Sequence, residues 1–298
     1  MEEGRILKGI AGFFYVECAD GRIYACRAKG GFRRAEIRPL PGDLVCFEIT
    51  HEGDKEGNLV EIKPRKNALI RPAVANVDQA LLFFSVRNPD PSLLLLDRYL
   101  VFIGRLGLPS ILCFNKTDLA SEEDLDAIRE AYRGCGHRLL FTSVRQGEGI
   151  DALREELTGR TTFLAGPSGA GKSSLINRLC PQAGMEIGEL SRKLSRGKNT
   201  TRHSEWFRVA EEADTWLIDT PGFTALELPD LTREELESCY GEFAPYSGMC
   251  RFTSCRHMEE PDCAVREAAD DGRIPAVRYE NYRQLFAEWQ ALDERKYR

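Results

Sequence analysis

The sequence predicts a multi-domain protein: a small N-terminal β-barrel, a central α/β domain with a phosphate-binding loop, and a C-terminal segment with helices and candidate metal ligands. Three observations support this fold class. Short strands separated by turns fill residues 5–63, apolar strands alternate with helical segments over 80–222, and cysteine and histidine gather in 250–263. We expect domains at 1–68, 69–226 and 227–298.

The N-terminal part reads as closely spaced strands. The stretches "RILKGIAGFFYVEC" (5–18), "RIYACRA" (22–28), "DLVCFEI" (43–49) and "LVEIK" (59–63) are separated by Gly- and Asp-containing turn signals. Antiparallel strands packed into about sixty residues indicate a small closed barrel. The alternative is a folded cap without a binding role.

The central part alternates strands with helices. We expect strands at 80–86, 110–114, 138–144 and 161–166, one more strand and turn at 215–222, and helices at 92–107, 121–136, 149–159 and 173–180. Ser121 should cap its helix, with Asp124 three residues later. The almost continuous apolar run "ALLFFSV" is typical of a strand buried on both faces. The alternation predicts a parallel sheet with helices on both faces.

Composition narrows the class of protein. The 298 residues are 42% hydrophobic, enough for real cores. No apolar stretch approaches membrane-spanning length, and the acidic N-terminus "MEEGRILKG" is unlike a signal peptide. We therefore expect a cytoplasmic protein with no membrane contact, in which ten cysteines do not form a disulfide framework. Six are expected to be buried thiols: Cys18, Cys26, Cys46, Cys113, Cys135 and Cys180.

The charge pattern is uneven. A net charge of −6 argues against nonspecific nucleic-acid binding. Basic residues nevertheless gather at 29–34, 63–66 and 191–202. Each cluster alone is more often a solvated surface than a binding patch.

The stretch "GPSGAGKSS" (166–174) matches the phosphate-loop pattern G-x-x-x-x-G-K-[S/T] between an expected strand and an expected helix. Its glycines allow the backbone N–H groups to curl around phosphate oxygens at the helix N-terminus. Lys172 would reach the β and γ phosphates, and Ser173 would bind Mg²⁺. The predicted phosphate-binding residues are Gly166, Pro167, Ser168, Gly169, Ala170, Gly171, Lys172, Ser173, Ser174 and, in the turn described below, Gly222.

The stretch "NKTD" (115–118) predicts a guanine reader at the end of a strand. The Asp118 carboxylate can accept hydrogen bonds from guanine N1–H and the 2-amino group, whereas adenine would leave it unpaired, at a cost of about 1–3 kcal/mol or more. Asn115 can bond the N7 edge or tie loops together, and the stem of Lys116 can cover the base. The predicted guanine-binding residues are Asn115, Lys116, Thr117, Asp118, Thr142, Ser143 and Val144.

The guanine reader precedes the phosphate loop by about fifty residues, the reverse of an ordinary GTPase. Ligands in open α/β sheets bind beyond the carboxyl ends of the strands, whatever the order in which the chain visits them. Both motifs can therefore serve one site if the GTPase domain is circularly permuted.

Two further segments complete the predicted pocket. In "DTPG" (219–222), Asp219 would hold Mg²⁺ through water and Gly222 would sense the γ-phosphate; in "KNTTRH" (198–203), Thr200 or Thr201 would close on Mg²⁺. A flexible loop with neither role is the alternative. Phe223 stands where many GTPases have the glutamine that orients water, so we predict weak intrinsic turnover and a partner that completes the site.

The C-terminal segment carries C-x4-C-x-H-x5-C, formed by Cys250, Cys255, His257 and Cys263. Three thiolates and an imidazole suit one closed, structural Zn²⁺ site per chain. Cys239 lies outside this spacing and is expected to pack. The last helix, after Pro275, carries an apolar stripe that we interpret as packing: Tyr282, Leu285, Phe286, Trp289 and Leu292.

This order of motifs behind a small barrel closely resembles the bacterial ribosome small subunit-dependent GTPase A family, over nearly the whole chain. The stretches "RKNALIRPAVANVDQ" (65–79) and "CRFTSCRHMEEPDCAVREA" (250–268) look like that family's domain join and zinc segment. The resemblance implies an OB-fold barrel, Mg²⁺-dependent hydrolysis of GTP to GDP stimulated by the small ribosomal subunit, a role in its late maturation, and contacts of the basic clusters with ribosomal RNA. A monomer is expected.

One position departs from the family. Its members often have His before the paired threonines, and here that residue is Asn199, with His203 four residues further on. Asn can hydrogen-bond a water but cannot accept its proton at neutral pH. The catalytic residue is therefore left unassigned, with Asn199 and His203 as candidates.

Two other readings stay open. One is an ATP-dependent kinase or ATPase, which "NKTD" argues against. The other is an RNA-binding assembly scaffold whose nucleotide pocket switches shape and turns over poorly, which Phe223 and Asn199 favour.

Overall fold

The computed structural model describes residues 1–28, 32, 37–70, 72–183, 204–210, 214–219 and 227–296, with the backbone alone at 182, 210 and 296. These form two compact units. The first comprises Met1–Gln79, Arg154–Leu164 and Ile176–Gly222; the second comprises Ala80–Leu153, Ala165–Leu175 and Phe223–Arg298.

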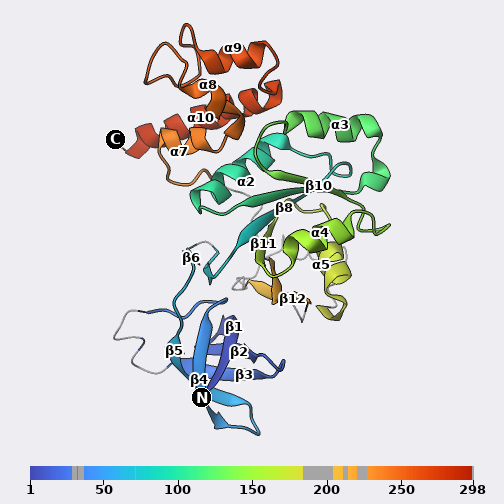
Figure 1. Cartoon of the computed structure of the whole chain (residues 1–298). Coiled ribbons are helices and arrows are strands. Elements are labelled where there is room, and N and C mark those ends of the chain that lie inside the picture. The colour runs from blue at the N-terminus through green and yellow to red at the C-terminus, as the bar shows by residue number, and fades with distance from the viewer. Residues whose placement is uncertain are drawn as a thin grey trace. The chain divides into compact units, whose positions relative to one another are not determined.

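The N-terminal strands close into a barrel in the order β1-β2-β3-β5-β4 (Figure 1). Alternate side chains point inward to a core that includes Tyr24, Phe47 and Leu59. The stretch 5–18 is not one strand but a hairpin, because Ala11 and Gly12 adopt φ of 50° and 84°, as two-residue hairpin turns require. The strands are β1 Glu2–Ile10, β2 Phe13–Cys18, β3 Ile23–Ala28, β4 Leu44–His51 and β5 Glu56–Ile62.

The first unit also contains a strand that the sequence did not predict. Strand β13 (Thr215–Asp219) pairs in parallel with β11 (Thr161–Ala165), as expected. On its other side β12 (Glu205–Ala210) runs antiparallel to β13, so the expectation of a purely parallel sheet is wrong. The stretch "EWFRVA" lacks the continuous apolar run of the buried strands, because the side chains of residues 205–209 are at most partly covered. A short hairpin precedes the sheet, formed by β6 (Ala68–Leu69) and β7 (Val74–Ala75).

Three parallel strands organise the second unit, with β9 (Ser110–Asn115) between β8 (Gln79–Ser85) and β10 (Arg138–Thr142). Every residue of β8 is buried, as its apolar run predicts. Helix α2 (Leu93–Arg105) is capped by Ser92 and is followed by Gly107 at φ 68°.

Helix α3 (Glu122–Ala131) begins with the predicted capping box of Ser121 and Asp124. It ends five residues earlier than expected, and Gly134 and Gly136 follow with positive φ. The remaining central helices are α4 (Ile150–Leu157) and α5 (Lys172–Leu179), with short 3-10 turns η1 (Thr117–Leu119) and η2 (Pro181–Ala183).

The C-terminal helices gather around one apolar core in the second unit (Figure 1). The stripe on α10 is confirmed as packing, since Tyr282 and Leu285 are fully buried and Trp289 packs against the same core. The elements are α7 (Arg233–Ser238), η3 (Gly241–Phe243), α8 (Ala244–Ser247), α9 (Ala264–Asp270) and α10 (Ala276–Lys296). Among the described helices, none combines the length and apolar character needed to cross a membrane.

A buried ionic cluster joins α10 to α2 within this unit. Arg278 is 1% exposed, and its Nε donates to Glu242 Oε1 at 2.5 Å while its Nη1 donates to Asp97 Oδ1. The Asp97 carboxylate also accepts hydrogen bonds from the Asn281 side-chain amide at 2.8 Å and from the Tyr132 hydroxyl at 3.0 Å. Burial acts to lower the pKa of Arg278, but the two carboxylates outweigh it and raise that pKa above its usual range. The guanidinium therefore remains charged inside the core.

Candidate nucleotide-binding and metal sites

The predicted phosphate loop lies between β11 and α5, where its glycines are required. Gly166, Gly169 and Gly171 have φ of 151°, 82° and 100°. A Cβ atom on Gly166 would lie 2.0 Å from the carbonyl oxygen of Phe83, so a side chain cannot fit there. This tight turn into a helix N-terminus is the backbone arrangement that binds phosphate oxygens.

Lys172, the first residue of α5, folds over the loop. Its ammonium group donates to the carbonyl oxygens of Gly166 and Pro167, both at 2.8 Å. A bound phosphate would offer this cation a charged partner in place of neutral carbonyls, and charge-assisted bonds are stronger. Ser173 follows on the same helix turn, where its hydroxyl suits a Mg²⁺ ligand. At the end of β13, Asp219 lies opposite Leu164, close in register to the start of the loop.

The predicted base-reading loop, residues 115–118, leaves the end of β9 in the same unit as the predicted phosphate loop. Lys116 adopts the left-handed conformation, with φ 67°, and burial lowers the pKa of its amine. Ser143 Oγ donates to Asp118 Oδ1 at 2.6 Å, and the Gln146 N–H donates in turn to Ser143 Oγ at 3.2 Å. The carboxylate is thereby held in one orientation with lone pairs left for a ligand.

Asn115 connects three loops. Its side chain is 3% exposed, and Nδ2 donates to the carbonyl oxygen of Ala170 in the phosphate loop at 2.9 Å. Oδ1 accepts the Val144 N–H at 3.0 Å and the Thr142 hydroxyl at 3.4 Å. A Cβ atom on Gly171 would meet this amide at 2.6 Å. The sequence left two roles open for Asn115, a bond to the N7 edge of guanine or bonds between loops, and the structure shows bonds between loops. The two motifs separated in the sequence therefore meet through one buried amide.

Sequence reasoning missed the segment 86–91, which follows β8. The carbonyl oxygen of Asn88 accepts a hydrogen bond from the Lys116 ammonium, and Pro89 lies 3.2 Å from where a Cβ of Gly169 would stand. Its position could have indicated a role at the site, because "RNPD" (87–90) leaves the carboxyl end of β8, the strand that pairs with β9.

Several predicted site residues lie outside the described part of the chain. These are the switch residues, the candidates for positioning water and the residue after the second turn: Thr200, Thr201, Gly222, Asn199, His203 and Phe223. The basic cluster 191–202 and most of 29–34 also lie outside it.

The third basic cluster, 63–66, is described, and its cations are paired within the first unit. Lys63 Nζ lies 2.5 Å from Glu3, Arg65 Nε lies 2.6 Å from Asp43, and Lys66 Nζ lies 2.8 Å from Asp78. The buried Asp43 carboxylate needs its arginine partner. This cluster thus fixes the chain segment that leaves the barrel, a role that the sequence did not indicate.

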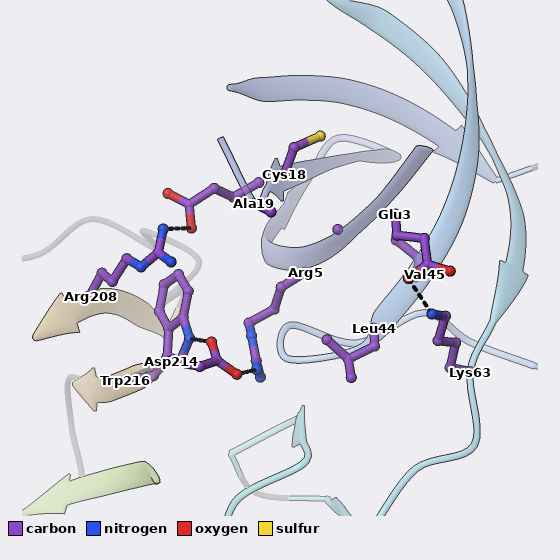
Figure 2. A pocket seen from close by; sticks show the side chains of 12 residues that line it. Glu3, Arg5, Cys18, Ala19, Leu44, Val45, Lys63, Arg208, Asp214 and Trp216 are labelled. Atoms are coloured by element: carbon purple, nitrogen blue, oxygen red, sulfur yellow. Dashed lines mark hydrogen bonds and ion pairs between the residues drawn. The ribbon is translucent and has the colours of Figure 1, made fainter. Parts of the chain in front are cut away.

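A cavity of about 340 Å³ lies between barrel strands and the β12–β13 hairpin within the first unit (Figure 2). Arg5 enters it from β1, donates to Asp214 at 2.9 Å, and lies 5.3 Å from the centre of the Trp216 ring. Arg208 lies 3.9 Å from Glu17. Charged side chains from the barrel and from the hairpin pair with one another in this cavity. We therefore interpret it as an interface between barrel and hairpin, and not as a ligand site.

The four predicted metal ligands come together in the second unit. The thiol sulfurs and the imidazole nitrogen all lie within 4.8 Å of one another. Cys250 Sγ and Cys263 Sγ are each 3.5 Å from His257 Nδ1 and 4.0 Å from each other. These separations match the edges of a tetrahedron around an ion with metal–ligand bonds of about 2.0–2.3 Å. The described residues therefore include a cluster that can hold one metal ion.

A carboxylate beside the cluster orients its histidine for metal binding. His257 Nε2 lies 3.2 Å from Glu237 Oε1, so the carboxylate accepts its N–H and leaves Nδ1 free to face the sulfurs. The predicted packing cysteine, Cys239, contacts the surrounding core and donates to the Glu235 carbonyl at 3.3 Å. The six cysteines expected to be buried are buried.

Comparison with known proteins matches two family models. The RsgA N-terminal domain matches residues 3–58, and the RsgA GTPase matches residues 62–229. Among named relatives, the small ribosomal subunit biogenesis GTPase RsgA of Agathobacter rectalis is 46% identical over 96% of this chain and 97% of its own. The protein of the same name from Alkaliphilus metalliredigens is 42% identical over 97% and 98%.

Two solved structures resemble the whole chain. YloQ, described as a circularly permuted GTPase, is 35% identical with a TM-score of 0.77, covering 98% of this chain and 96% of its own. YjeQ from Thermotoga maritima is 33% identical with a TM-score of 0.78, covering 96% and 98%. Family models, relatives and structures agree over both the barrel and the nucleotide-binding loops, and the chain belongs to the RsgA GTPase family.

Proposed function

We propose that this protein binds the small ribosomal subunit and its RNA, hydrolyses GTP to GDP and phosphate with ribosome-stimulated turnover, and assists late maturation of the subunit in the cytoplasm. One observation carries the nucleotide part: Asn115 ties the base reader to the phosphate loop despite their inverted order in the sequence. The names of the relatives support the ribosomal part. We further propose that it acts as a monomer with the domain boundaries given above.

The proposed roles combine the geometry of the described loops with the sequence motifs, and those of Thr200, Thr201 and Gly222 rest on the motifs alone. The carboxylate of Asp118 reads guanine, the loop 166–174 and Lys172 hold the phosphates, and Gly222 senses the γ-phosphate. Ser173 and Asp219, with Thr200 or Thr201, would hold Mg²⁺, which neutralises charge on the β and γ phosphates. The chain's own contribution is to place the nucleotide and exclude adenine. The cysteine cluster would hold one structural Zn²⁺, because three thiolates and one imidazole suit that ion.

We expect slow GTP turnover by the isolated protein and strong stimulation by purified small ribosomal subunits. Phe223 cannot orient water, and where a partner completes a GTPase site the gain is about 10³–10⁵-fold. Phosphate release with and without subunits measures this, and Lys172→Ala is the inactive control. Turnover that small subunits leave unchanged, beside intact GDP binding, would instead favour the assembly-scaffold reading.

Replacing Asp118 by asparagine should weaken GDP binding about 10- to 100-fold, because an amide N–H would face a guanine donor and about 1–3 kcal/mol would be lost. Xanthosine diphosphate, which has a carbonyl in place of the 2-amino group, should gain affinity. Calorimetry with both nucleotides measures the change. Asp126→Asn, an exposed position on α3, is the matched control. Equal GDP affinity of Asp118→Asn and the parent protein would exclude Asp118 as the base reader.

A further inference from the structure

The segment 86–91 contacts both nucleotide-binding loops, although it belongs to neither. The carbonyl oxygen of Asn88 accepts a hydrogen bond from the ammonium of Lys116 in the base-reading loop. Pro89 lies against the phosphate loop, where a Cβ atom of Gly169 would stand 3.2 Å from its Cδ. The segment therefore contacts both the residue that would cover the base and the turn that would hold the phosphates.

Strand β8 fixes this segment in place. Ser85, 1% exposed and the last residue of the strand, donates from Oγ to the carbonyl oxygen of Pro89 at 2.6 Å. The Val86 N–H donates to the carbonyl oxygen of Asn115 at 2.8 Å. On the outer side, Arg87 donates to both oxygens of Asp124 at 2.6 and 3.2 Å. Bonds on two sides leave the Asn88 carbonyl little freedom to move.

The long side chain of Lys116 needs such an anchor. A lysine side chain has several rotatable bonds and loses much freedom when it is held in one conformation. A stem that covers a base keeps its position better when its far end is fixed, and in this structure the Asn88 carbonyl fixes it. A preorganised side chain loses less entropy when the ligand arrives, which tightens binding, and most affinity differences between related complexes appear in the dissociation rate.

We propose that Ser85 and Pro89 are positioning residues for the guanine nucleotide: they hold the Asn88 carbonyl, which in turn holds Lys116 beside the base. The proposal rests on the proposed function, because it assumes that this site binds guanine nucleotides. Neither residue is assigned a contact with the ligand. Their effect should be visible only while the Lys116 ammonium is present.

The test is a double-mutant cycle on the dissociation rate of fluorescently labelled GDP from the full-length protein. Ser85→Ala should raise that rate about tenfold. Lys116→Met should raise it by itself, and Ser85→Ala added to Lys116→Met should change it by less than about twofold. Ser110→Ala, another buried serine at the opposite end of the neighbouring strand, is the matched control. It should leave the dissociation rate unchanged even if it lowers the melting temperature.

A second variant covers the case in which Ser85→Ala does not fold. Arg87 is partly exposed, so Arg87→Met, which removes the bonds to Asp124 on the outer side of the segment, should fold, and it should also speed GDP release only when Lys116 is present. An equal effect of these variants with and without the Lys116 ammonium would overturn the proposal, as would an unchanged rate in both. Absence of GDP binding by the parent protein would instead overturn the proposed function.

Discussion

Replacing Cys255 by alanine is expected to remove the bound metal and unfold the segment around it. The site would lose one of its four ligands, and structural zinc sites contribute about 10–16 kcal/mol of apparent binding energy to small domains. Metal analysis of the purified full-length protein should give one zinc per chain for the parent and well under one for Cys255→Ala. Thermal unfolding should begin at a much lower temperature, because the bound metal stabilises only the folded state.

A cysteine outside the cluster provides the comparison. Cys239 is half-buried in the same unit, and its thiol contacts the Glu235 carbonyl rather than the four ligands. Cys239→Ala should keep a full complement of zinc and lose only the packing of one small side chain. If Cys255→Ala keeps its metal and its melting temperature, the four residues do not form a structural metal site.

Replacing Arg278 by methionine should destabilise the protein by about 3–5 kcal/mol, because two carboxylates in the core lose their cation. Asp97 is fully buried and Glu242 is 6% exposed, so water cannot replace the guanidinium. Urea denaturation measures the loss. Arg129→Met removes an exposed arginine that pairs with two carboxylates on α3, and it should cost less than about 1 kcal/mol.

Two further measurements separate the buried charge from simple loss of packing. A triple variant, Arg278→Met with Asp97→Asn and Glu242→Gln, should recover much of the stability, because no uncompensated charge remains. Burial raises the pKa of Asp97 even with its partners present. A carboxyl whose pKa is raised by folding destabilises the protein as the pH rises through that pKa, so the deficit of Arg278→Met should shrink toward pH 5. A deficit that does not change with pH would point to packing alone.

The sequence allowed the prediction of those features that local chemistry controls. The phosphate loop needs glycine at Gly166 and Gly171 whatever surrounds it, since their φ values exclude other residues. The capping box of Ser121 and the spacing of the four metal ligands are equally local. An almost continuous apolar run as short as that of β8 predicts a strand buried on both faces, because both sets of alternating side chains then avoid water.

Features that depend on partners distant in the chain were missed or left open. Strand β12 has no strong local signal, since it is only partly covered and its ladder is supplied by β13. The sequence could not choose between two roles for Asn115, because the choice depends on Ala170, 55 residues away. Nor could it show that Arg278 sits in the core, where an arginine is rarely found without partners.

The sequence by itself thus determined which ligand chemistry is predicted: glycines that would admit a phosphate, a carboxylate that would match guanine, and four residues that would suit zinc. Only the tertiary structure decided how these groups are held, because the holding bonds join residues far apart in the chain. The amide of Asn115 unites the two nucleotide motifs, and the Asn88 carbonyl anchors Lys116. Hydrogen bonds over such separations depend on how strands distant in the sequence pair, and no local pattern of residues predicts them.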